Sequence, residues 1–336
     1  MGWGGVCRAA EPQLLPGMFE LTQAQLDFMD AFGYLHLPGV LAPRIEAITE
    51  AHNALMYRLP RRRGREQDER PGRISCCPFM EHDAYLCTLL DEEHMHGVAT
   101  ALLGPDYQFS AGDGNHYVQE TGWHSDSWPN PLRYYKFALY LDPTTRDTGS
   151  LRVIPGSHRV GEPFAEELDS RLRRVGPSFG VAEDELPSVA IETQPGDLLV
   201  FDQAIKHSAF GGVHRRHMSI NYHLLADTPE LVAELETRRL QQGYCWADVF
   251  GTASPPPLLA NAPAERLRHL EHLQKFTPQE RLGAYHPQIF FTDENGEQSR
   301  RAAADIGEAE AVAMTTDHHA DGPDGWRRFR ASAARL

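Results

Sequence analysis

Cysteine is scarce in this chain of 336 residues, and its five cysteines do not predict a disulfide framework. Two of them, Cys76 and Cys77, are direct neighbours, which is not the spacing of a zinc-binding pair. An odd number of cysteines without such spacing is typical of reduced thiols, so we expect a cytoplasmic protein. The full set is Cys7, Cys76, Cys77, Cys87 and Cys245.

Positive charge is also in short supply. The formal net charge is −15, and only Lys136, Lys206 and Lys275 are lysines. Nucleic-acid binding needs a basic face that neutralises phosphates, so we do not expect a nucleic-acid partner. The segment RLPRRRGREQDERPGR, from Arg58 to Arg73, departs from this balance. We expect it to be a solvated or mobile loop, with contact to an anionic substrate as the alternative.

Long apolar runs are absent as well. No stretch of about 18 apolar residues occurs, which predicts that the chain does not span a membrane. Residues 1–17 lack the basic stretch and apolar core of a signal peptide, and we expect a flexible leader there. The apolar fraction of 41% is nevertheless enough for a substantial core, and the length suits one large domain with appendages.

The N-terminal part contains the pattern of amphipathic helices. Thr22 and Gln25 have the spacing of a capping box, and Gly33 can end the helix in a left-handed conformation. Two further helices are predicted over residues 43–59 and 91–104.

From about residue 107 the period changes to that of short β-strands bounded by turn residues. Helices followed by many short strands predict a mainly β sandwich or barrel with helices packed outside it. The segments are YQFSAG, NHYVQE, RYYKFALYLD, SLRVIPG, SVAIETQ, DLLVFD and HMSINYHLL.

Three His-x-acid triplets begin at His124, His269 and His319, about the number that this composition gives by chance. On a strand, residues i and i+2 face the same side, whereas on a helix they diverge. His269 lies in a helical pattern and His319 in a loose tail. Only His124 and Asp126 follow a predicted strand, so they can converge on one metal ion.

A mononuclear iron site of the two-histidine, one-carboxylate type needs one more histidine. His207, in QPGDLLVFDQAIKHSAFGG, follows an apolar strand and can supply it; the alternative is a surface loop histidine. His158, in PGSHRV, competes as a third ligand, but its tight turn favours a structural hydrogen bond.

Five segments in fixed order resemble the phytanoyl-CoA dioxygenase family of iron(II)/2-oxoglutarate oxygenases, and GWHSD is locally similar to its ectoine hydroxylase branch. The resemblance implies a double-stranded β-helix (jelly-roll, cupin-like) core with iron held by His124, Asp126 and His207. The segments are LTQAQLDFMDAFGYLHLPGVL, GWHSD, TGSLRVIPGSHR, PGDLLVFDQAIKHSAFGG and RRHMSINYH.

The family also implies a basic residue after the distal histidine that binds the far carboxylate of 2-oxoglutarate. Adjacent Arg215 and Arg216 face opposite sides of the predicted strand, and family register favours Arg216. Ser219 has the same parity as Arg215 and would join it in the other register.

Further pocket candidates are weaker, because ordinary strand or core packing explains them equally well. Three alternate on the strand before His124 and could contact 2-oxoglutarate: Asn115, Tyr117 and Gln119. Three lie just past the metal loop and could line the substrate entrance: Trp128, Tyr134 and Lys136.

The resemblance implies a dioxygenase that uses Fe(II), 2-oxoglutarate and O2 to hydroxylate a small molecule, forming succinate and CO2. Halogenases related to this family need a small residue at the carboxylate position, so Asp126 favours hydroxylation. Two alternatives stay open: a non-catalytic binding module on the same fold, and another metal-dependent cupin-like enzyme. The substrates of the family range from acyl-CoA thioesters to natural-product intermediates of secondary metabolism, so the sequence does not identify one.

We therefore expect four regions: a leader at 1–17, an oxygenase domain at 18–228, a helical and loop extension at 229–300, and a mobile tail at 301–336. The extension could cover the active site or form a homodimer interface.

Overall fold

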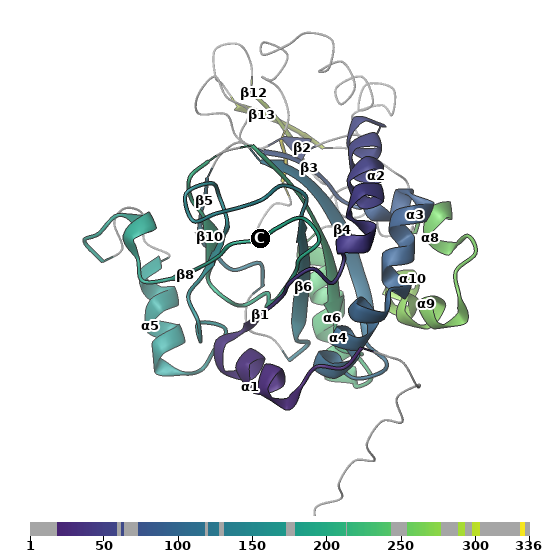
Figure 1. Ribbon diagram of the computed structural model, residues 1–336, viewed down its shortest axis with the longest axis horizontal. Helices are drawn as coiled ribbons and strands as arrows, with labels where there is room; N and C mark the ends of the chain where they lie inside the picture. Colours follow the sequence, from purple (N-terminus) through teal and green to yellow (C-terminus); the bar gives the residue numbers. More distant parts are fainter. Residues whose placement is uncertain are drawn as a thin grey trace, which may run out of the picture.

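In the computed structural model, the described residues are 19–58, 62–63, 73–117, 120–127, 131–172, 179–212, 214–242, 254–276, 288–292, 298–302 and 330–332. The two larger β-sheets lie next to each other, and most of the helices gather on the outer side of one of them (Figure 1). None of the helices in these ranges has the length and hydropathy that a membrane span requires.

The N-terminal helices begin and end where the sequence predicts. Thr22 and Gln25 form the capping box of α1, and Gly33 closes the helix with φ of 82°. Predicted residues 43–59 and 91–104 correspond to α2 and α4. The helices of this part are α1 (Gln23–Phe32), α2 (Ile45–Arg58), α3 (Ala84–Cys87) and α4 (Glu93–Leu103). A further helix, α5 (Pro163–Leu172), lies in the second half of the chain's β-rich part.

Two antiparallel sheets form the centre of the molecule, and this confirms the double-stranded β-helix class. The large sheet has the order β1 (Tyr34–Leu37), β9 (Leu198–Asp202), β6 (Tyr134–Tyr140), β11 (Arg215–His223), β4 (Gln108–Tyr117), β3 (Arg73–Cys76) and β2 (Arg62–Arg63). The small sheet has the order β5 (Thr121–His124), β10 (His207–Ala209), β7 (Leu151–Val153) and β8 (Val189–Ile191).

The large sheet is buried on both faces, and the alternation along each strand separates two cores. On β6, Phe137 and Leu139 pack into the core beneath the helices. Ala138 and Tyr140 face the small sheet and pack with residues of β7 and β8. Burial on both faces explains why RYYKFALYLD is almost continuously apolar. The inner face of this sheet is the one that can carry a site.

Strand β4 is longer than predicted, and β3, β5 and β10 are not among the predicted segments. YQFSAG and NHYVQE were expected as two segments separated by Asp113 and Gly114, but β4 runs through both. A Cβ at Gly112 would collide with Met80, and one at Gly114 with the ring of Phe79. These glycines mark a close approach of the helix layer to the strand rather than a turn. Most of the Arg-rich segment lies outside the described residues; within it, Arg62 and Arg63 form edge strand β2, which pairs with β3.

Of the chain after residue 228, the described helices between residues 256 and 276 pack on the helix-covered side of the large sheet. Leu258, Leu270 and Leu273 join the main core, and Gln108 of β4 accepts a hydrogen bond from the His272 N–H at 3.0 Å. In Figure 1, α2, α3, α8, α9 and α10 gather beside β4. The elements are α6 (Pro229–Gln242), α8 (Pro256–Leu259), α9 (Ala264–His269), α10 (Glu271–Phe276), β12 (Gln288–Thr292), β13 (Gln298–Ala302) and β14 (Arg330–Ser332).

The expected division at residue 300 passes through β13, which pairs with β12, and β14 of the expected tail pairs with the same strand. The leader and the rest of the tail lie outside the described residues. The four expected regions therefore stay a prediction.

Candidate active site

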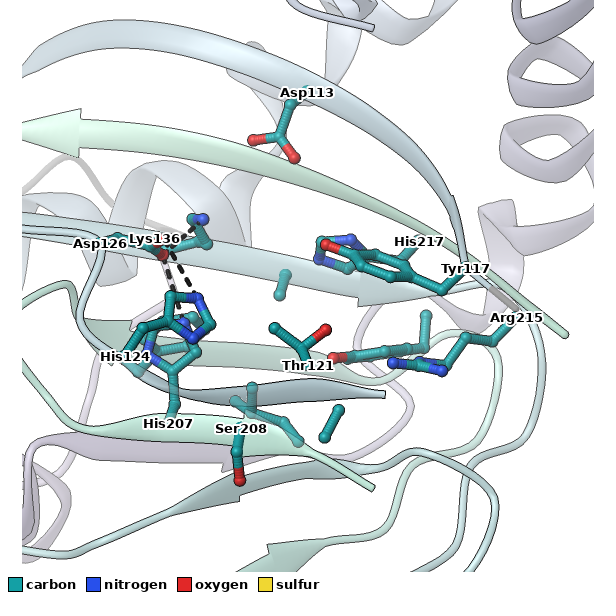
Figure 2. Close-up of a pocket in the computed structure, with 15 residues that line it drawn as sticks. Asp113, Tyr117, Thr121, His124, Asp126, Lys136, His207, Ser208, Arg215 and His217 are labelled. Atoms are coloured by element: carbon teal, nitrogen blue, oxygen red, sulfur yellow. Dashed lines mark ion pairs between the residues drawn. The ribbon is translucent and has the colours of Figure 1, made fainter. Parts of the chain in front are cut away.

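A pocket lies between the two sheets, and most of its wall comes from alternate residues of their facing strands. At one end are His124, Asp126 and His207, at the other are Tyr117 and Arg215, and Thr121 lies between them (Figure 2). The other lining residues are Asp113, Lys136, Ala138, Tyr140, Leu151, Phe201, Ser208, Ala209 and His217.

The main chain sets the spacing of the two histidines at the first end. His124 ends β5 and His207 begins β10, and the two are directly opposite each other in the antiparallel pair. Asp126 follows β5 by two residues, and its backbone N–H donates to Gln203 O at 2.9 Å. One nitrogen of each imidazole and one carboxylate oxygen lie within 4.8 Å of one another. The structure thus brings the three predicted ligands together.

Hydrogen bonds fix which nitrogen of each ring faces this cluster. His124 Nδ1 lies 2.8 Å from Gly122 O, and His207 Nδ1 lies 3.0 Å from Ile205 O. A carbonyl can only accept, so both Nδ1 atoms carry hydrogen and the neutral rings leave Nε2 with a lone pair. These Nε2 atoms face Asp126, at 3.8 Å for His124 and 3.5 Å for His207.

The residues fit a divalent metal ion. Burial lowers the pKa of His207 to about 3, so its imidazole is neutral near pH 7. Burial alone would raise the pKa of Asp126, but the charges of Lys136 and the histidines hold that pKa well below its usual range. Two neutral nitrogens and an ionised carboxylate are the donor set of mononuclear iron sites with open positions. Hydrogen bonds from Nδ1 to carbonyls are the usual support of such ligands.

Lys136 of β6 is the cation beside this cluster. Its Nζ lies 2.6 Å from Asp126 Oδ2, and both side chains are mostly buried. Although burial alone would lower the pKa of Lys136, Asp126 and Asp113 hold that pKa above its usual range. The ammonium therefore neutralises the carboxylate from the large-sheet side of the pocket. This contact places Lys136 at the end of the pocket with the predicted metal ligands, whereas the sequence suggested that it lines the substrate entrance.

We expect Lys136→Met to lower the free energy of unfolding of the metal-free protein by about 3 kcal/mol, because Asp126 loses its buried counter-ion. Saturation with a divalent metal should recover most of this loss, since the metal then balances the carboxylate. Denaturant unfolding with and without metal measures both effects. Lys206→Met is the matched control, because Lys206 pairs with Asp169 away from the pocket. An equal metal response in both variants would contradict the assignment.

Arg215 forms the far end of the pocket. It is only 2% exposed, and its Cζ lies 4.8 Å from the ring centroid of Tyr117. A Cβ at Gly149, whose φ is 92°, would collide with the guanidinium. Gly149, the first glycine in TGSLRVIPGSH, therefore leaves room for Arg215. A buried guanidinium in a pocket is suited to a carboxylate ligand.

The structure corrects the sequence prediction for Arg216, which lies on the face of β11 opposite to Arg215 and the pocket. Two of its nitrogens reach the Asp142 carboxylate, Nη2 at 2.6 Å and Nε at 3.1 Å. Nη1 donates to Asn53 of α2 at 3.2 Å. The prediction of Arg216 in the pocket was wrong because β11 alternates faces and places Arg216 on the helix side.

The remaining candidates divide into three groups. Tyr117 lines the pocket, but Ser219 and Asn115 do not. Both Ser219 and Asn115 donate a hydrogen bond to the carboxylate of Asp113, and Asp113 lines the pocket. Tyr134 also lies away from the pocket, in a separate core cluster with Leu132, Ala226 and Leu235. Gln119 and Trp128 lie outside the described residues.

His158 takes the structural role that its turn predicts. Its Nε2 lies 3.1 Å from Asp30 O, at the end of α1, and it is not part of the metal cluster.

Asp113, Tyr140 and His217 line the pocket but were not predicted from the sequence. His217 shares the parity of Arg215 on β11, and Tyr140 shares that of Lys136 on β6. Alternation along these strands was therefore a usable signal. Asp113 gave none, because the Asp-Gly pair resembles a turn.

Comparisons with known proteins show which family the chain is similar to. The phytanoyl-CoA dioxygenase (PhyH) family model matches residues 29–218, more than half of the chain. The dioxygenase andF of Emericella variicolor is 27% identical over 164 residues, 43% of this chain and 52% of andF. An uncharacterised protein of Mycobacterium tuberculosis is 27% identical over 213 residues, 56% of this chain and 69% of its own length. The match thus spans about half of andF.

Among solved structures, the non-heme α-ketoglutarate-dependent carbocyclase SnoK from nogalamycin biosynthesis is similar with a TM-score of 0.50. It is 20% identical, and the alignment covers 61% of this chain and 84% of SnoK. At this identity the likeness shows a shared fold.

Proposed function

The chain belongs to the phytanoyl-CoA dioxygenase family, and from this membership and its pocket we propose an iron(II)/2-oxoglutarate-dependent dioxygenase that hydroxylates a small molecule. The observation that carries the proposal is the arrangement of the pocket: a two-histidine, one-carboxylate cluster at one end and a buried arginine at the other (Figure 2). A short dicarboxylate suits such a pocket, with one end at the metal and the other at a cation.

In this proposal, His124 and His207 hold the iron through Nε2, and Asp126 holds it through its carboxylate. When bound, iron with 2-oxoglutarate and O2 supplies the oxidising chemistry, and the products are succinate, CO2 and an alcohol. Arg215 binds the far carboxylate of 2-oxoglutarate. This replaces our sequence-based choice of Arg216.

The other pocket residues hold charge and exclude water. Leu151 and Phe201 supply apolar wall on opposite sheets, which keeps the polar contacts of the pocket strong. Lys136 keeps Asp126 ionised and ready to bind metal. Asp126 itself favours hydroxylation over halogenation, because it fills the position that a halide would need.

The test is succinate formation by protein reconstituted with Fe(II) and supplied with 2-oxoglutarate and air. We expect slow succinate release without added substrate, dependent on both iron and O2. We also expect that 2-oxoglutarate at about a hundredfold excess over its Kd stabilises the iron-loaded protein by about 3 kcal/mol.

The two alternatives give different results. A binding module would be stabilised by 2-oxoglutarate without forming succinate. Another metal-dependent cupin-like enzyme would be stabilised by metal alone, with no added effect of 2-oxoglutarate. Either result would overturn the proposal.

A further inference from the structure

A second cluster of metal-ligating side chains lies on the opposite side of the large sheet from the pocket. It consists of His96 of α4 and of Glu265 and His269 of α9, and we call it the α4–α9 cluster. One nitrogen of each ring and one carboxylate oxygen lie within 4.8 Å of one another. The ring of His269 stacks on Tyr107, which is part of the core beneath the helices. The cluster is therefore separate from the active site.

Tyr107 holds both histidine rings by their Nδ1 atoms. His269 Nδ1 lies 2.6 Å from Tyr107 O, and His96 Nδ1 lies 3.0 Å from the Tyr107 hydroxyl. Since a carbonyl can only accept, His269 Nδ1 carries the hydrogen, and Nε2 of the neutral ring has a lone pair. His269 thus has the same carbonyl support as the two histidines of the active site, whereas His96 is held by a hydroxyl group.

Both Nε2 atoms are turned toward one carboxylate oxygen. Glu265 Oε1 lies 3.3 Å from His269 Nε2 and 3.8 Å from His96 Nε2. Around a tetrahedral zinc ion with bonds of about 2.0–2.1 Å, neighbouring ligand atoms lie roughly 3.4 Å apart. Glu265 and His269 are four residues apart on one helix face, a spacing that suits two ligands of the same ion.

The lone pair of His269 Nε2 faces the carboxylate of Glu265, and a cation between these two groups would relieve their repulsion. Burial lowers the pKa of His269 and that of His96. Glu265 stays ionised, because its hydrogen bond and charge pairing with Arg268 outweigh burial and lower its pKa. Neutral imidazoles and a carboxylate are the states that bind metal.

Arg268 is the one competing cation in the described surroundings of Glu265. It donates to Glu265 Oε1, but it also lies 3.1 Å from Asp106 Oδ1 and donates to Pro105 O at 3.1 Å. It therefore keeps two partners when Glu265 turns to a metal. Glu265 is half-exposed, so it can turn and a water molecule can complete the coordination.

We propose that His96, Glu265 and His269 bind a second divalent cation, best matched by Zn²⁺, which ties helix α9 of the C-terminal extension to helix α4. Two nitrogens and one oxygen with a water molecule form a tetrahedral zinc site. The ion has a structural role, because it joins segments about 170 residues apart in the sequence.

The experiment separates the two sites by removing the first. A His124→Ala/His207→Ala variant lacks both active-site histidines but keeps the α4–α9 cluster. We expect it to bind one equivalent of Zn²⁺ in calorimetry, and to unfold at a higher temperature with Zn²⁺ than with chelator. The wild type should bind two equivalents.

Glu265→Gln in this background tests the cluster itself. Gln keeps a hydrogen-bond acceptor for Arg268 but loses the charge of the ligand. The side chain is half-exposed, so the fold should tolerate the change. We expect zinc affinity to fall at least about 100-fold, with loss of the zinc-dependent rise in unfolding temperature. Glu271→Gln is the matched control, because exposed Glu271 begins the next helix and lies outside the cluster.

Two results would overturn the proposal. The background variant could fail to bind Zn²⁺ at micromolar concentration. Alternatively, Glu265→Gln could lower stability equally with and without Zn²⁺, which would indicate an ordinary ion pair between protonated His269 and Glu265. Because the readout is zinc binding in a variant without the two active-site histidines, neither result bears on the proposed oxygenase activity.

Discussion

His207→Ala is expected to reduce iron-dependent succinate formation by at least about 100-fold. Removing only a hydrogen-bond partner of a metal ligand typically weakens metal affinity by about 10- to 100-fold, and removing the ligand itself should cost more. His207 is buried, faces Asp126 at 3.5 Å and is opposite His124 in the small sheet. Succinate measured by chromatography at saturating 2-oxoglutarate gives the activity, and equilibrium dialysis gives the retained iron.

His158→Ala is the informative control, because His158 competes with His207 as the third ligand in the sequence. Its imidazole contacts Gly33 and the end of α1, so the variant should lose some stability but retain iron and succinate formation. Both variants are compared at a temperature where circular dichroism shows them folded. Loss of iron in His158→Ala and its retention in His207→Ala would contradict the ligand assignment.

Arg215→Gln is expected to raise KM for 2-oxoglutarate about 100-fold or more. Removing one partner of a buried, hydrogen-bonded charge pair typically costs about 2–5 kcal/mol, and each 1.4 kcal/mol is a factor of ten. Arg216→Gln should change this KM less than about threefold, since Arg216 is bound to Asp142 on the other face of β11. The dependence of succinate formation on 2-oxoglutarate concentration measures both.

The two arginines are adjacent, so each variant serves as the chemical control for the other. Arg215→Lys should recover part of the lost affinity, because a point charge replaces the two-pronged guanidinium. A general loss of folding in Arg215→Gln would lower succinate formation at every 2-oxoglutarate concentration instead of raising KM. The assignment is wrong if Arg216→Gln has the larger effect on KM.

The fold class could be predicted from the sequence, and so could the three side chains that the structure brings together at one end of the pocket. His124 and Asp126 were distinguishable from two other triplets by local structure alone. His207 needed the resemblance as well, because the short strand β10 that holds it has only three residues and little pattern of its own. The pairing that places His207 opposite His124 is a property of the folded sheet.

The choice between Arg215 and Arg216 failed for a different reason. Counting residues from His207 ignores the loop between β10 and β11, whose length does not determine the parity of the strand. The alternation of apolar residues along β11 indicates which of the two arginines faces the pocket. Met218, Ile220 and Tyr222 are apolar and face the helix core, so even-numbered positions, including Arg216, point away from the pocket.

The α4–α9 cluster could not be predicted from local pattern. Glu265 and His269 have a spacing that suits a metal site, but the same spacing is common on solvated helix faces. His96 is about 170 residues away, and only the packing of α9 against β4 and Tyr107 brings it near. Long-range packing decides such a site.

The two walls of the pocket come from different sheets, and this division has a consequence for how relatives can diverge. The small sheet holds both histidines through its main-chain pairing, with their Nδ1 atoms on backbone carbonyls. The large sheet supplies side chains such as Tyr117, Tyr140 and His217. Mutations on the large sheet can therefore reshape the pocket over evolutionary time while the two histidines keep their positions. One reactive centre can thus be retained across enzymes that act on different molecules.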